Sequence, residues 1–148
     1  MHQFAQLPCL LAQPQQPTSN LDCMSEPLSP SVGMGVIHLF GHPAADFDAQ
    51  ALIAAVNDAK GRGTQVVTVA MLGHKADMAF MAVSADMREL RALQTAIQNA
   101  GVFISDSYVS LTEVSEYAAN VPEEMRNARL YPQVPVAGKN AWCFYPMS

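Results

Sequence analysis

Tyr145 is the side chain in this sequence best suited to redox or proton chemistry. It lies in an apolar run that ends in Tyr-Pro-Met-Ser, and a proline follows it directly. A tyrosine hydroxyl in such a run has few partners unless a ligand or water reaches it. Tyrosine can donate a proton or carry a radical, so this position could be catalytic. A core tyrosine packed under a following domain fits the local sequence equally well.

Histidine and aspartate side chains are weaker candidates. His74 and Asp77 lie in a short segment between two expected strands, where they could share a metal ion or a proton. We favour a connecting loop in which Asp77 or His74 bonds to nearby backbone. His38 and His42 are four residues apart, but the first falls in an expected strand and a proline follows the second. They do not share a helix face as zinc ligands do, so we predict no metal site.

Hydroxyl groups and arginines gather in the last third of the chain. Residues 107–117 carry two tyrosines and several hydroxyls, and a half-buried strand is the favoured interpretation. Arg126 and Arg129 follow, just before a Tyr-Pro pair. The arginine fork suits bidentate binding of a carboxylate, although arginines in a charged loop are usually solvated. No glycine-rich nucleotide loop, P-loop, zinc-protease motif or nucleophile elbow occurs.

The composition indicates a globular domain that meets a partner. Of 148 residues, 50% are hydrophobic and 14% charged, with a net charge of −5. The scattered basic residues argue against nucleic acid and anionic membranes as partners. No run approaches the roughly 20 apolar residues of a membrane span. The three cysteines form no C-x-x-C pair, which fits a reducing, cytoplasmic compartment.

Hydrophobic periodicity predicts an α+β fold in the order βαββαβ, the ferredoxin-like arrangement. Asp46 or Asp48 is expected to cap the first helix, and Asp86 with Glu89 resembles a capping box for the second. The expected strands cover residues 36–40, 64–71, 78–83 and 102–114. Gly41-His42-Pro43 is expected to end the first of them.

The chain divides into four expected parts. Residues 1–32 are rich in Gln and Pro and are expected to be disordered. Residues 33–117 form the ferredoxin-like domain, 118–140 a linker loop, and 141–148 the first strand of a second, truncated domain. The chain ends within that apolar strand, so we expect it to be a fragment of a longer protein.

The expected strand at 78–83 is apolar on both faces. In an isolated ferredoxin-like domain one face packs on the helices, and the other should alternate to polar residues. We therefore expect another domain or another subunit to cover the second face.

Several blocks of residues occur in one order along the chain, at 73–81, 107–117, 129–132 and 143–148. This series resembles the chlorite dismutase family, and within it the coproheme decarboxylases of haem biosynthesis. Ser-Tyr-Val-Ser and Phe-Tyr-Pro-Met are the most specific blocks. The resemblance covers about residues 33–148 and matches only the N-terminal half of the family's subunit.

The resemblance implies a haem-dependent enzyme with two ferredoxin-like halves per subunit, assembled into a homo-oligomer, usually a pentamer. Such an enzyme uses hydrogen peroxide to remove carbon dioxide from two propionates of coproheme, giving haem b. Tyr145 would be the catalytic redox tyrosine. The residues that would bind the porphyrin are Arg129 and Arg126 near the propionates and Met147 in the pocket wall.

The family's proximal iron-ligating histidine has no counterpart in this sequence. It lies on a helix further along the subunit, and none of the four histidines here matches it: His2, His38, His42 and His74. Haem iron needs an axial ligand, so we expect this chain alone to bind coproheme poorly and to be inactive. The alternative is a stand-alone, non-catalytic ferredoxin-like module for oligomerisation or small-ligand binding.

Overall fold

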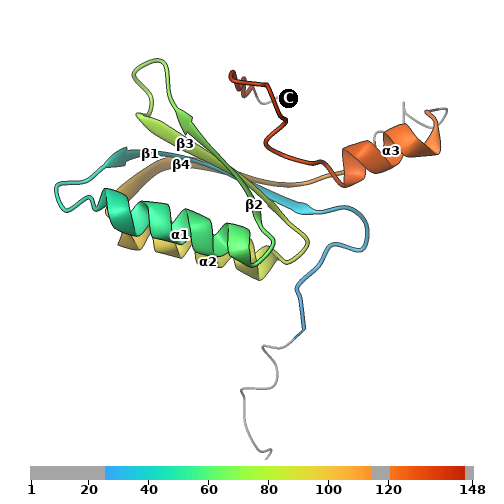
Figure 1. The fold of residues 1–148 in the computed structure, drawn as a ribbon, viewed down its shortest axis with the longest axis horizontal. Coiled ribbons are helices and arrows are strands. Elements are labelled where there is room, and N and C mark those ends of the chain that lie inside the picture. Colours follow the sequence, from blue (N-terminus) through green and yellow to red (C-terminus); the bar gives the residue numbers. More distant parts are fainter. Residues whose placement is uncertain (1–25, 115–120, 146–148) are drawn as a thin grey trace, which may run out of the picture.

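The computed structural model describes residues 26–114 and 121–145. An antiparallel four-stranded sheet with the order β2-β3-β1-β4 forms its centre, and helices α1 and α2 cover one face (Figure 1). The elements are β1 Gly35–Pro43, α1 Ala49–Gly61, β2 Gln65–Ala70, β3 Met78–Ser84, α2 Met87–Asn99, β4 Val102–Leu111 and α3 Glu123–Leu130. The predicted α+β class and βαββαβ order are confirmed.

Strand β1 is longer than the sequence predicts. The expected break at Gly41-His42-Pro43 is wrong, because the strand continues and His42 pairs with Phe103. A β-bulge between Phe40 and Gly41 absorbs the irregularity. A Cβ at Gly41 would lie 2.6 Å from the carbonyl oxygen of Phe103, so glycine is what lets β4 approach here.

Helix α1 begins at an aspartate, as predicted. The carboxylate of Asp48 accepts hydrogen bonds from the backbone N–H groups of Gln50, at 2.8 Å, and Ala51, at 3.0 Å. These bonds satisfy two of the unpaired donors of the first turn and identify Asp48, rather than Asp46, as the cap. The helix ends before Gly63, whose φ of +91° suits glycine.

Helix α2 begins at Asp86, which accepts a hydrogen bond from the backbone N–H of Arg88 at 2.9 Å. The cap is therefore as predicted. Glu89 has a different role from the expected capping box, since its carboxylate accepts a hydrogen bond from Arg62 Nε at 2.8 Å. This contact ties the start of α2 to the end of α1.

The hydrophobic core lies between the sheet and the two long helices. Leu39 of β1 and Phe80 of β3 face Leu93 and Ile97 of α2, and all four side chains are at most 2% exposed. Burial of each side chain of this size stabilises the fold by about 1.5–3 kcal/mol. The helices therefore belong to one face of the sheet, and the opposite face, here called the second face, is left for other contacts.

The second face is formed by the alternate residues of the same strands. Strand pairing sets His38 beside Met81 and Tyr108 on this face. Ala79 and Val83, which also point away from the helices, are 0% exposed. The sequence predicts cover from another domain or subunit. In the structure the chain's own residues 132–145, here called the C-terminal segment, cross this side of the sheet (Figure 1).

Two expectations for the last third of the chain differ from the structure. The linker predicted at 118–140 contains α3, whose acidic residues Glu123 and Glu124 lie in the first turn and Arg129 in the last. That charge order favours a helix through its dipole. The strand predicted at 141–148 is not formed at 141–145, where the segment contacts the sheet through side-chain rings.

The end of the expected disordered extension is bound to the domain. Leu28 donates its backbone N–H to the Asp86 carboxylate at 3.0 Å and accepts a bond from the N–H of Met87 at 3.0 Å. The rest of that expectation, residues 1–25, lies outside the described residues. None of the helices in the described ranges is long and apolar enough to cross a bilayer.

Candidate functional site

Tyr145 is the last residue described and lies at the end of the C-terminal segment. Its side chain is 73% exposed. Exposure alternates along the residues that lead to it, with Trp142 and Phe144 half-buried and Cys143 exposed. This alternation is that of an extended chain with one side against a surface. The phenol of Tyr145 is therefore open to a ligand.

Aromatic stacking holds the C-terminal segment on the second face. The ring centroid of Phe144 lies 4.7 Å from that of His38, 5.2 Å from Phe40 and 5.1 Å from Tyr108. The indole of Trp142 stacks on His38 at 5.6 Å with an interplanar angle of 22°. We call these five residues the aromatic cluster. Aromatic pairs at such distances add about 0.5–1.5 kcal/mol each beyond burial.

His38 acts as an aromatic ring within this cluster. Burial lowers the pKa of its imidazole below the ordinary value of 6.5. Its Nδ1 atom is buried and has no hydrogen-bond partner among the described residues. A neutral ring suits these surroundings, since a charged imidazolium would lose water without gaining an acceptor at Nδ1.

A pocket of about 310 Å³ opens beside the aromatic cluster. Four of the cluster's rings line it, together with the charged residues Lys75 and Asp106. This volume is at the lower end of the roughly 300–1,000 Å³ of small-molecule sites. Its lining of rings with two charged side chains suits a small, mostly apolar group with a polar part.

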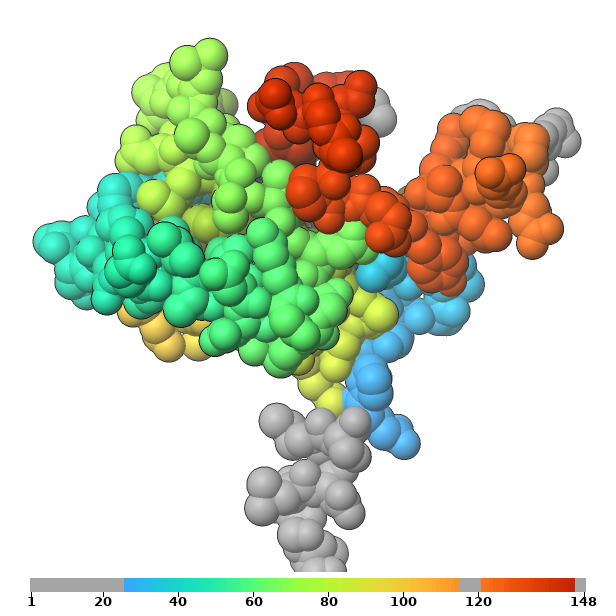
Figure 2. Space-filling view, in the orientation of Figure 1, coloured from blue at the N-terminus to red at the C-terminus, as the bar shows by residue number. Residues whose placement is uncertain are grey.

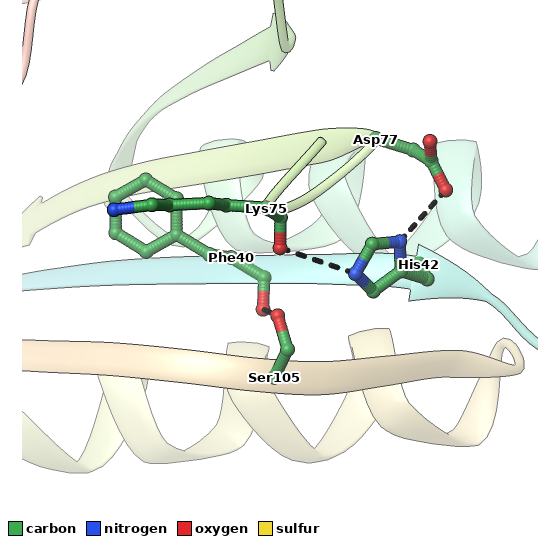
Figure 3. Close-up of polar contacts among 5 residues, drawn as sticks. All are labelled: Phe40, His42, Lys75, Asp77 and Ser105. Atoms are coloured by element: carbon green, nitrogen blue, oxygen red, sulfur yellow. Dashed lines mark hydrogen bonds and ion pairs between the residues drawn. The ribbon is translucent and has the colours of Figure 1, made fainter. Parts of the chain in front are cut away.

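The candidate pair His74 and Asp77 is not brought together as a site. Asp77 binds His42 instead, with 2.9 Å between the carboxylate and Nδ1 (Figure 3). The Nε2 atom of His42 lies 3.2 Å from the carbonyl oxygen of Lys75. Both ring nitrogens are thus engaged in fixing the β2–β3 loop to β1. The same view shows Ser105 donating to the carbonyl oxygen of Phe40.

The two candidate arginines lie on α3, and both are exposed. Arg126 lines a pocket of about 450 Å³ with Asn127 and Glu113, between α3 and the end of β4. Figure 2 shows open space between α3 and the last described residues, which are joined through the intervening part of the C-terminal segment. The structure therefore does not place Arg126 or Arg129 next to Tyr145. Met147, the remaining candidate, lies outside the described residues.

The aromatic cluster was missed by sequence reasoning. Its signal in the sequence is the alternation of the large rings of Trp142 and Phe144 with the smaller side chains of Ala141 and Cys143, which suggests that the rings share one side of an extended segment. Nothing in the sequence says which surface receives that side. His38 lies far earlier in the chain, and its contact with these rings becomes visible only in the fold.

A ferredoxin-like sheet with two helices on one face defines the class of this domain. The family model for chlorite dismutase matches residues 45–148, more than half of the chain. The chain belongs to the chlorite dismutase family. The family resemblance found in the sequence is thus confirmed, and with it membership of a haem-binding family.

The described residues do not fit the iron of a haem group. Haem iron takes an axial ligand from the protein, often histidine. His38 is enclosed by rings, His42 is bonded on both nitrogens, and His74 lies in the exposed β2–β3 loop. No group of three His, Cys, Asp or Glu side chains suited to a metal occurs in the described ranges. What these ranges do offer are the exposed phenol of Tyr145 and the exposed guanidinium groups of Arg126 and Arg129 on α3.

Proposed function

We propose that the protein carrying this chain is a coproheme decarboxylase. It would be a cytoplasmic homo-oligomer that uses hydrogen peroxide to remove carbon dioxide from two propionates of coproheme, giving haem b. Family membership and the Ser-Tyr-Val-Ser and Phe-Tyr-Pro-Met blocks support this branch of the family. The observation that carries the proposal is the exposed phenol of Tyr145 at the end of a segment stacked on the sheet.

Each decarboxylation is a two-electron oxidation of the substrate. A propionate side chain loses carbon dioxide, two electrons and one proton, which leaves a vinyl group. One hydrogen peroxide takes up two electrons and two protons and becomes two waters. In our proposal Tyr145 would first give up its phenolic hydrogen atom, one proton and one electron, to the peroxide-derived oxidant. The phenoxyl oxygen then takes a hydrogen atom from the propionate, the bond to the carboxylate breaks, and the second electron passes to the peroxide-derived oxidant.

The arginines of α3 would bind the carboxylates of the substrate. The guanidinium fork matches a carboxylate with two parallel hydrogen bonds, which are stronger than neutral ones. Arg129, in the last turn of α3, is the leading propionate contact, and Arg126 is the second. Met147 would line the porphyrin pocket. A second ferredoxin-like half and an axial histidine outside residues 1–148 would complete the site.

The direct test is product analysis with the full gene product. The purified protein is mixed with coproheme, and hydrogen peroxide is added. The porphyrins are then separated and identified by mass spectrometry. We expect coproheme to lose two molecules of carbon dioxide and become haem b. Coproheme that remains intact, under conditions where it binds and peroxide is consumed, would contradict the proposal.

A non-catalytic module is the second candidate function. Two observations favour it: the chain's own C-terminal segment lies on the second face, and the described histidines offer no iron site. Titration of the 148-residue chain with coproheme, followed by the Soret band, tests the module hypothesis. Tight, saturating binding would contradict a module with no porphyrin function.

A further inference from the structure

Gln65 binds the backbone of the C-terminal segment on both sides of Gln133. Its Nε2 donates to the carbonyl oxygen of Pro132 at 2.9 Å, and its Oε1 accepts from the N–H of Val134 at 2.6 Å. Gln65 is the first residue of β2, which is an edge strand. Its side-chain amide therefore offers the segment one donor and one acceptor, as the backbone of a neighbouring strand does.

Thr112 forms the second attachment, just beyond the end of β4. Its hydroxyl donates to the carbonyl oxygen of Leu130 at 2.6 Å and accepts from the N–H of Met34 at 2.7 Å. Gly33 leaves room for this hydroxyl, because a Cβ there would lie 2.5 Å from Thr112 Oγ1. Gly33 also has a φ of +77°, which favours glycine. Thr112, just after β4, thus links the residue before β1 to the last residue of α3.

Together these side chains hold residues 130–134 to both edges of the sheet. In the order β2-β3-β1-β4, Gln65 lies on one edge strand and Thr112 follows the other. Arg129 comes directly before the held residues, and Tyr145 lies at the other end of the C-terminal segment. The aromatic cluster holds the segment a second time, through Trp142 and Phe144 just before Tyr145.

We propose that Gln65 and Thr112 are positioning residues, which set where the backbone leaves α3 and so fix Arg129 relative to Tyr145. The catalytic consequence rests on the proposed function, whereas the attachment itself does not. A propionate that binds Arg129 must reach the Tyr145 phenol. Small displacements of reacting groups are costly, with about 1 Å of misplacement capable of lowering a rate about 100-fold.

Hydrogen exchange tests the attachment in the chain as it exists. Gln65→Met keeps the side-chain length and removes both hydrogen bonds. A hydrogen bond in the lower part of the usual range changes an opening equilibrium by about threefold, so the loss of both bonds corresponds to about tenfold. We expect backbone exchange in residues 132–145 to become about tenfold faster. Gln133→Met is the matched control, since Gln133 is an exposed glutamine in the same segment. Equal exchange in the two variants would overturn the proposal.

Steady-state kinetics of the full gene product test the positioning role. Thr112→Val removes the hydroxyl at nearly constant volume, and Thr112→Ser keeps the hydroxyl. We expect Thr112→Val to lower kcat about tenfold or more with KM for coproheme changed less than twofold, and Thr112→Ser to recover most of kcat. A kcat for Thr112→Val equal to wild type would refute positioning. If the protein does not decarboxylate coproheme at all, hydrogen exchange still decides whether the attachment exists.

Discussion

The imidazole of His38 and the indole of Trp142 are stacked, with centroids 5.6 Å apart and planes inclined by 22°. Phe144 contacts the same imidazole at 4.7 Å. A residue of the first strand thus holds a segment near the other end of the sequence. Because Trp142 and Phe144 come just before Tyr145, this contact sets the position of Tyr145 on the domain. The second face of the sheet therefore helps to position the candidate catalytic residue.

The stability of the chain should decrease as pH falls below 6.5. Burial lowers the pKa of His38 from its ordinary 6.5, so the unfolded chain takes up a proton at a higher pH than the folded chain does. The contribution of His38 is complete above pH 6.5, is lost as pH falls towards its folded pKa, and changes no further below that. Urea unfolding at a series of pH values, followed by Trp142 fluorescence, measures this loss.

His38→Phe provides the comparison for that pH series. Phenylalanine keeps a flat ring against Trp142 and Phe144 and removes the titrating group. We expect the variant to show a shallower decrease in unfolding free energy below pH 6.5 than wild type. The same pH dependence in both proteins would show that His38 is not the group responsible.

Gly101→Ala should destabilise the fold more than Gly138→Ala. Both glycines have positive φ, +81° and +75°, so each substitution meets a backbone cost of about 1–2 kcal/mol. A Cβ at Gly101 would also lie 2.6 Å from Cα of Phe47, whereas Gly138 has open space around it. Thermal unfolding of both variants isolates the steric cost. Equal melting temperatures would contradict the close packing of the loop before α1 against Gly101.

Arg129→Ala should weaken coproheme binding by the full gene product. Hydrogen bonds to charged groups contribute about 1.5–3 kcal/mol, which corresponds to about a 10–100-fold rise in KM or Kd. Arg91→Ala is the control, since Arg91 is exposed on α2, on the helical side of the sheet. An unchanged affinity in Arg129→Ala would remove this residue from the propionate site.

Local sequence rules were enough for most of the fold. Asp48 and Asp86 cap the two long helices because a short carboxylate can reach the free N–H groups of a first turn. The order of helices and strands along the chain followed from the periodicity of apolar residues. The break expected at Gly41-His42-Pro43 was wrong, because the glycine marks a bulge inside the strand.

Helix α3 could not be separated from a loop by the same rules. Its eight residues have no buried side chain, so they carry no apolar stripe to reveal the period of a helix. The acidic first turn and Arg129 in the last turn are the signals that were present. Short helices of this kind are marginal by propensity alone and depend on their context.

The contacts that place the candidate site are long-range, and this is why the sequence did not reveal them. Gln65 reaches Pro132 and Val134 across 67 and 69 positions of the chain. Thr112 and Gln65 bind backbone atoms of their partners. Because almost every residue type has these atoms, the partners' identities do not reveal the contacts. Tyr145 and Arg129 were candidates from the local sequence, the family resemblance supplied their roles, and those roles remain predictions.

The most direct test of the proposed function compares wild type with Tyr145→Phe in the full gene product. Phenylalanine keeps the ring and removes the hydroxyl hydrogen that the proposed mechanism requires. Coproheme binding is read from the Soret band, and porphyrin products are measured after addition of hydrogen peroxide. We predict that the variant binds coproheme as wild type does and forms no haem b. Formation of haem b by Tyr145→Phe at the wild-type rate would contradict a catalytic role for this tyrosine.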